Sequence, residues 1–276
     1  MQSVNVDELH VAAGVAYQRL GSGEPLVLVH GAGGSHRSWD AVLPFLQPYR
    51  DVLALDLPGF GSSPSLSKAS PHTPGMMAAA VEQLLDALGL DRPHVAGHSY
   101  GGWVALELAK RGRVGSVTGV CPAGLWPSTG SLRARLQLRK SRLLAVACRR
   151  IAPLLLSSRT GRRVLLSGSC VRPADVAHGL AVQAAADLAT ADGFLPVYRG
   201  MIGARFTGGA ALSLPVHLVL AANDRLLPPA ENSCSTELPP YTTWSLLPGC
   251  GHIPQWDDPA AVAAAILTNT ARIQVS

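Results

Sequence analysis

The segment HVAGHSYGGW, residues 94–103, limits the possible folds most, because it changes from a strand pattern to a helix pattern through one serine. Residues 94–96 predict a short buried strand, and residues 100–111 predict a helix. A strand that enters a helix through the single residue Ser99 needs a tight turn with a strained backbone. The glycines two residues before and after this serine suit the turn, since side chains there would collide across it. The serine would then project above the carboxyl edge of a sheet, where open α/β sheets bind ligands.

The alternation of strands and helices continues along most of the chain. Continuously apolar or β-branched runs predict strands, and most of them are followed by a helical pattern. The predicted strands are 25–29, 51–55, 94–96, 114–120, 216–222 and 242–247, and the predicted helices are 38–46, 76–88, 100–111 and 259–271. Residues 4–20 predict a hairpin that turns at Ala13-Gly14 and forms an antiparallel edge. This order favours a mostly parallel sheet with helices on both faces, which is an α/β fold.

The middle of the chain differs from this pattern. Between residues 124 and 196 there is no strand pattern, only helical stretches rich in Leu, Arg and Ala. We therefore predict a core domain formed by residues 1–124 and 197–276, and a helical cap, or lid, inserted at residues 125–196. A chain of 276 residues that is 47% hydrophobic and 15% charged suits one large α/β domain with such an insertion.

Ser99 is a candidate nucleophile, and two later residues are its candidate partners. A serine hydroxyl attacks efficiently only with a base beside it and an acid that orients the base. Asp224 follows the predicted strand 216–222, and His252 follows the predicted strand 242–247. The order Ser99, Asp224, His252 is the one expected for this sheet topology. The other acid position, after strand 114–120, reads Cys-Pro-Ala-Gly and offers no carboxylate.

Acyl transfer also needs N–H donors for the developing oxyanion. The Tyr100 amide at the start of the predicted helix supplies one donor, and the glycine-rich loop at residues 30–34 should supply the second. We assign the second donor to the Ala32 amide, with the Gly33 amide as the alternative. The candidate pocket residues are His30, Gly33, His98, Trp103 and Trp256, although the histidines could instead bond backbone groups and the tryptophans could instead pack in the core. Neither a cofactor nor a metal is expected, since the histidines have no metal-like spacing.

Five ordered motifs together resemble the α/β-hydrolase superfamily with a helical lid. They are HGAGG, DLPGFGSS, GHSYGG, the Asp224 loop and GCGHIPQW, and apart from the lid they span nearly the whole chain. The resemblance implies the α/β-hydrolase fold, with an eight-stranded, mostly parallel sheet and a helical cap, and it supports Ala32 as an oxyanion donor. Serine at position 99 departs from the relatives that use aspartate there, which argues against epoxide hydrolase or haloalkane dehalogenase chemistry.

These residues predict a serine hydrolase that cleaves a carboxylic ester or a related acyl bond. The same triad would serve a C–C bond hydrolase, a thioesterase or a cofactor-free perhydrolase. C–C bond hydrolases resemble this chain at Cys250–Trp256, but they usually carry Gly-Pro where Gly33-Gly34 stands here. A ligand receptor, or a biosynthetic lyase or cyclase, on the same fold is an alternative of another class.

The charge distribution is uneven. Residues 108–174 contain fourteen Lys or Arg and no Asp or Glu, whereas the rest of the chain has nine cations and eighteen acids. One explanation is a solvated lid face whose arginine stems cover apolar surface. Another is an anionic partner: a carboxylate-bearing substrate, a carrier or coenzyme with phosphopantetheine, or a membrane surface. Nucleic acid is not expected, because no binding motif accompanies the arginines.

The N-terminal sequence, the length of the apolar runs and the cysteines limit the expected location and chemistry of the protein. The sequence shows no signal-peptide pattern and no run of eighteen apolar residues, so we expect a cytoplasmic protein without a transmembrane segment. The five cysteines contain no C-x-x-C pair, which argues against a disulfide framework and a zinc site. The expected partner is a small-molecule acyl substrate, and the sequence does not indicate an oligomeric state.

Overall fold

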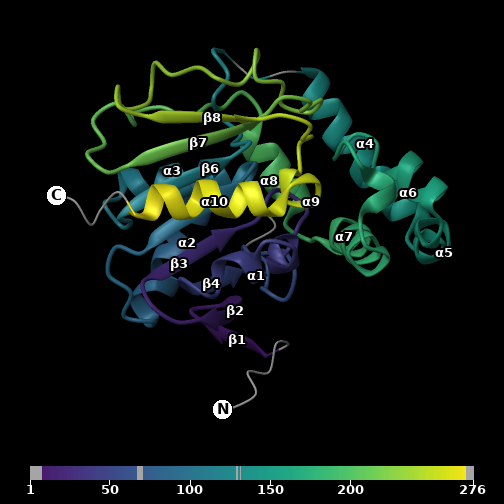
Figure 1. Cartoon of the computed structure of the whole chain (residues 1–276), viewed down its shortest axis with the longest axis horizontal. Helices are drawn as coiled ribbons and strands as arrows, with labels where there is room; N and C mark the ends of the chain where they lie inside the picture. Colours follow the sequence, from purple (N-terminus) through teal and green to yellow (C-terminus); the bar gives the residue numbers. More distant parts are fainter. Residues whose placement is uncertain (1–7, 67–70, 129, 131, 272–276) are drawn as a thin grey trace.

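The computed structural model describes residues 8–66, 71–128, 130 and 132–271. They form one eight-stranded sheet with the strand order β1-β2-β4-β3-β5-β6-β7-β8 (Figure 1). The strands are β1 (Leu9–Ala12), β2 (Val15–Gly21), β3 (Pro25–Val29), β4 (Asp51–Leu55), β5 (His94–His98), β6 (Ser116–Val120), β7 (Val216–Ala221) and β8 (Thr243–Leu247). Strand β2 pairs antiparallel with β1 and β4, and the other neighbours pair in parallel. The predicted fold class, with a mostly parallel eight-stranded sheet, is therefore confirmed.

Two buried layers cover the sheet because successive side chains of a strand point to opposite faces. Val27 of β3 belongs to the layer under α2 (Pro74–Ala87) and α3 (Tyr100–Lys110). Its neighbour Leu28 belongs to the opposite layer, under α10 (Pro259–Thr270). Every residue of β4, β5, β6 and β7 is buried, as expected for strands covered on both faces. This core fixes the carboxyl edge of the sheet, where the candidate site lies.

The predicted strands and helices are confirmed within two residues at each end, with one exception. The predicted helix 38–46 is wrong, because the segment divides into a 3-10 turn, η1 (His36–Trp39), and a short helix, α1 (Leu43–Leu46). Pro44 explains the division, since proline has no N–H to donate and cannot lie inside a continuous helix. The predicted hairpin is confirmed from Leu9 onward, and the beginning of its first half, residues 4–7, lies outside the described residues.

The regular structure of the described segment between β6 and β7 is helical, and turns and loops connect its helices. It contains α4 (Leu132–Cys148), α5 (Ala152–Ser157), α6 (Arg159–Leu165), η2 (Pro173–Asp175), α7 (His178–Thr190) and α8 (Phe194–Met201). Helices α4 to α7 lie to one side of the sheet (Figure 1). Helix α8 runs across the predicted boundary between residues 196 and 197, and its Phe194 and Val197 belong to the main core. Of the helices in the described chain, none is long and apolar enough to span a bilayer.

Candidate active site

Ser99 occupies a strained turn between β5 and α3. Its φ of +52° lies in the left-handed region, which residues with side chains rarely adopt. A Cβ at Gly97 would lie 2.2 Å from the Gly101 carbonyl oxygen, and one at Gly101 would lie 2.3 Å from that of Val29. Side chains at these two positions would therefore collide with backbone, as the sequence predicts. The backbone locks the serine at the carboxyl edge of the sheet.

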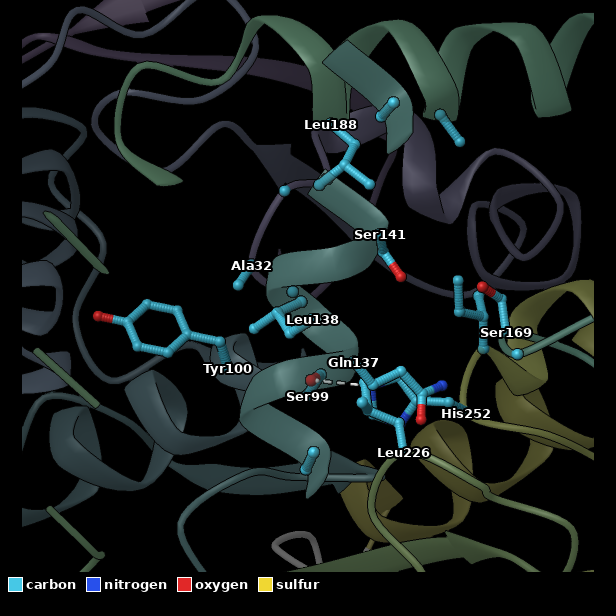
Figure 2. A pocket seen from close by; sticks show the side chains of 18 of the residues that line it. Ala32, Ser99, Tyr100, Gln137, Leu138, Ser141, Ser169, Leu188, Leu226 and His252 are labelled. Atoms are coloured by element: carbon cyan, nitrogen blue, oxygen red, sulfur yellow. Dashed lines mark hydrogen bonds between the residues drawn. The ribbon is translucent and has the colours of Figure 1, made fainter. Parts of the chain in front are cut away.

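His252 links Ser99 to Asp224. The His252 Nε2 atom lies 3.0 Å from the Ser99 Oγ (Figure 2). The His252 Nδ1 atom lies 2.8 Å from Asp224 Oδ2. Because an ionised carboxylate only accepts hydrogen bonds, the imidazole proton belongs on Nδ1, and Nε2 can accept the proton of the Ser99 hydroxyl. The structure thus brings together three residues that are far apart in the sequence.

The carboxylate of Asp224 is held in its charged form. Burial alone would raise its pKa, but the neighbouring His252 and the hydrogen bonds that the carboxylate accepts outweigh burial, and the pKa lies below its usual 3.8. Two of these bonds come from the backbone amides of Leu226 and Leu227, each 2.8 Å from Oδ1. Oδ1 is therefore fixed by the loop after β7, while Oδ2 is left for the imidazole.

His98 supports the loop of His252. Its Nε2–H donates to the His252 carbonyl over 2.7 Å, and the two rings are 5.0 Å apart between centroids. Burial, with the nearby His252 as a second cause, lowers the pKa of His98 to about 3. His98 is thus neutral at ordinary pH and holds the His252 backbone in place by one donated hydrogen bond.

Replacing His98 by glutamine should make the stability less dependent on pH. The unfolded chain has an ordinary histidine pKa of about 6.5 at this position, so between pH 6.5 and about 3 it binds one proton more than the folded chain. The free energy of unfolding therefore falls as the pH falls, by about 3 kcal/mol between pH 7 and pH 4. Glutamine keeps an N–H donor but does not titrate, so His98→Gln should remove this part of the loss in urea unfolding.

The matched control for this experiment is His178→Gln, which removes an exposed imidazole. This control should keep the pH dependence of the wild type. An unfolding free energy of His98→Gln that falls as steeply as that of the wild type would contradict the prediction.

Two backbone amides of the pocket, those of Ala32 and Tyr100, are the predicted oxyanion donors. Ala32 and Tyr100 both line the same pocket as Ser99, and neither amide donates a hydrogen bond within the described residues (Figure 2). Tyr100 is the first residue of α3, where an amide has no acceptor within its own helix. Its side chain points away from the serine and donates to the His72 carbonyl over 3.2 Å, so Tyr100 enters the site through its backbone.

The pocket above Ser99 lies between the sheet edge and the lid helices. Its volume is about 290 Å³, and α4 crosses it with Gln137, Leu138 and Ser141, while Leu188 of α7 closes another side (Figure 2). Further leucines complete the apolar wall: Leu144, Leu156, Leu165 and Leu166. Of the described residues that line the pocket, Arg135 alone is a lysine, arginine, aspartate or glutamate. The wall therefore suits an apolar group.

The structure brings three of the five candidate pocket residues to the wall: Gly33, His98 and Trp256. It leaves His30 and Trp103 behind the wall. The His30 Nδ1–H donates to the Gly31 carbonyl, and its Nε2 accepts from the Leu57 amide, so both ring nitrogens bind backbone. Trp103 is buried in the core and packs edge-on against Trp126, which lines the pocket instead.

Sequence reasoning missed Asp257, which connects the His252 loop to the lid. Its carboxylate accepts hydrogen bonds from the backbone amides of Gly251, at 2.8 Å, and of Val171 and Arg172, at 2.9 Å each. The nearest sequence signal is the N-cap of α10, but that role belongs to Asp258, which accepts from the Ala261 amide. Nothing in the sequence relates Asp257 to lid residues more than eighty positions away.

Comparisons with known proteins agree with this fold. A family model described as the alpha/beta hydrolase family matches residues 26–265. The chain is 29% identical over 202 residues to epoxide hydrolase EphH of Mycobacterium tuberculosis, a match that covers 69% of this chain and 92% of that protein. It is 38% identical over 89 residues to pimeloyl-[acyl-carrier protein] methyl ester esterase of Legionella pneumophila, which covers 32% of this chain and 33% of that protein.

Among solved structures, the chain is similar to a membrane phospholipase A described as a bacterial virulence factor. The TM-score is 0.71 and the identity 26%, and the similarity covers 100% of this chain and 86% of the other. The common architecture thus includes the strands that carry Ser99, Asp224 and His252.

Proposed function

The chain belongs to the alpha/beta hydrolase family, and on this premise we propose that it is a serine hydrolase that cleaves a carboxylic ester through an acyl-enzyme intermediate. The observation that carries the proposal is the continuous relay from Ser99 Oγ through His252 to Asp224, with separations of 3.0 Å and 2.8 Å. A nucleophile, a base and an orienting acid in this order perform acyl transfer on several unrelated folds.

In the proposed mechanism, His252 takes the Ser99 proton as the hydroxyl oxygen attacks the acyl carbon. The Ala32 and Tyr100 amides stabilise the negative charge that develops on the acyl oxygen. His252 then protonates the leaving alcohol, and the acyl group stays on Ser99. In the second half, His252 removes a proton from water, which attacks the acyl carbon and releases the acid. Asp224 stabilises the imidazolium that forms in each half.

Two observations favour an ester with an apolar acyl group over the alternatives. The pocket wall is largely apolar, and its volume of about 290 Å³ suits a small or medium-sized acyl group. The similar proteins include an esterase and a phospholipase, but also a C–C bond hydrolase, so their names do not decide between these substrates. One relative is named as an epoxide hydrolase. The resemblance implies aspartate at the nucleophile position of enzymes that open epoxides, and this chain has serine at position 99, which favours acyl transfer.

A series of p-nitrophenyl esters with increasing acyl length tests the proposal. While each added CH₂ is buried in the pocket, kcat/KM should rise about fourfold, because burial of one CH₂ stabilises the transition state by about 0.8 kcal/mol. The rise should stop once the acyl chain fills the cavity. A series in which kcat/KM is independent of chain length would contradict an apolar acyl pocket.

Two further measurements separate the other functions. A vinylogous diketo acid is the matched substrate for C–C bond hydrolysis, and its turnover without ester turnover would replace the proposed function. Single-turnover ester cleavage, together with strong thermal stabilisation by a small ligand, would instead indicate a receptor.

A further inference from the structure

Helix α4 has an apolar stripe on the side that faces away from the pocket. Leu132, Leu136 and Leu143 are 61%, 56% and 61% exposed, and Val146 is 39% exposed. Their spacing of four, seven and three residues puts them on one side of a helix. No residue of α4 is buried, and the side that lines the pocket, with Leu138, Ser141 and Ala145, is the opposite one.

Exposed apolar side chains continue beyond α4. Ile151, Leu154 of α5 and Val164 of α6 are also exposed. Of the nineteen exposed large apolar side chains among the described residues, nine lie within residues 132–164. Helices α4, α5 and α6 lie together at one end of the molecule, on the right of Figure 1. Such a concentration on one part of a surface indicates an interaction site.

Cations accompany this apolar stripe, and two of them have no acidic partner within the described residues. Arg139 and Lys140 are exposed beside the leucines, and neither forms an ion pair or hydrogen bond within the described residues. Arg133 has one acidic neighbour, Glu231, at 3.8 Å on the exposed surface. The partner of this face must therefore be apolar and negatively charged at once.

We propose that the outer face of α4, formed by Leu132, Leu136, Arg139, Lys140 and Leu143, is a docking surface for an anionic lipid membrane. A helix that lies in a membrane surface puts its apolar side chains below the headgroups and its basic side chains among anionic headgroups. Both kinds of side chain are present on this face. The binding is peripheral, since none of the described helices can span a bilayer.

Other occupants fit this face less well. A second copy of the chain would place the same unpaired cations against one another, and like charges across an interface repel. Protein interfaces are enriched in aromatic side chains and Met as well as Arg, and residues 132–164 contain arginines but no Tyr, Trp, Phe or Met. Branched aliphatic side chains among basic residues therefore match an anionic lipid surface better than a second copy of the chain or another protein.

Docking would also connect the membrane to the pocket, a step that rests on the proposed function. Leu138, Ser141 and Ala145 on the opposite side of α4 line the cavity above Ser99. The same helix would therefore touch lipid with one side and the acyl group with the other. A lipid-derived ester is the substrate class that this arrangement fits.

Vesicle sedimentation with the full chain tests the docking surface. The protein should bind vesicles of phosphatidylcholine and phosphatidylglycerol in equal amounts at least about tenfold more tightly than vesicles of phosphatidylcholine alone. The preference should weaken between about 0.1 M and 1 M NaCl, because salt screens the cations. Ser99→Ala should bind as the wild type does, which separates docking from catalysis.

Two double variants locate the surface. L136D/L143D and R139E/K140E should each weaken binding to the anionic vesicles about tenfold or more. The matched control is V11D/L246D, which also replaces two exposed apolar residues by aspartate, but in β1 and β8. This variant should bind vesicles as the wild type does. Circular dichroism should show that all three variants fold, since every altered side chain is exposed.

Several outcomes would overturn the docking surface: equal binding to neutral vesicles, no binding, or full binding by L136D/L143D. A dimer that L136D/L143D converts to a monomer would assign the face to a second copy of the chain. Binding to an acidic acyl-carrier protein in place of vesicles would assign it to a protein partner. Ester turnover without vesicle binding overturns docking alone, whereas vesicle binding without ester turnover overturns the proposed function alone.

Discussion

Replacement of Ser99 by alanine is expected to lower kcat for an ester about 10⁴- to 10⁶-fold and to leave KM within a few-fold of the wild type. The reason is that Ser99 Oγ lies within hydrogen-bond reach of His252 Nε2, whereas the cavity wall does not change. Steady-state kinetics measure the effect. A fluorophosphonate probe followed by mass spectrometry should find one adduct, on the peptide that contains Ser99, in the wild type and none in the variant.

The matched control is Ser141→Ala. Ser141 also directs a hydroxyl toward the pocket, from α4, but it has no base beside it within the described residues (Figure 2). This variant should keep its labelling and keep kcat within about tenfold of the wild type. Labelling of Ser99→Ala at the wild-type rate, or loss of labelling in Ser141→Ala, would show that Ser99 is not the nucleophile.

The sequence predicts the core fold well because its signals are local. A buried parallel strand must be continuously apolar, and the turn at Ser99 must have glycines where a Cβ would meet backbone at 2.2–2.3 Å. Once the sheet is assigned, parallel strands end at one edge, so residues such as Asp224 and His252 are brought toward Ser99 by topology alone. These constraints depend on residues close in sequence and on general rules of sheet connection.

The lid could not be predicted in the same detail because its longest helix, α4, has apolar side chains on two sides. On α4, Leu138 lines the pocket while Leu136 and Leu143 face solvent, so the apolar pattern does not indicate which side packs on the protein. The pocket wall depends on this orientation. Trp103 and Trp126 show the same limit, since only the packing of the folded chain decides which of two neighbouring tryptophans reaches the pocket.

Replacement of Asp224 by asparagine should lower kcat about 10⁴-fold while the fold is kept. The amide oxygen can still accept from the Leu226 and Leu227 backbone, which now bind Oδ1. The amide NH₂ then takes the place of Oδ2 and donates to His252 Nδ1, so the imidazole proton moves to Nε2. An Nε2 that carries a proton cannot accept the one from Ser99. Steady-state kinetics with a short-chain ester, together with urea unfolding, measure the two expectations.

Asp56 offers a matched control, because it forms the other buried Asp–His pair of the core. Its Oδ1 lies 2.9 Å from His36 Nδ1, and neither residue lines the pocket. Asp56→Asn should therefore lower the stability, since Asp56 also accepts from the Ser62 amide, but keep kcat within about tenfold of the wild type. If Asp56→Asn lost activity while Asp224→Asn kept it, the assignment of Asp224 as the acid that orients His252 would be wrong. Among the described residues, Asp224 is the carboxylate that bonds the imidazole that reaches Ser99, so the charge of Asp224 and the His252 tautomer that it sets should decide the rate.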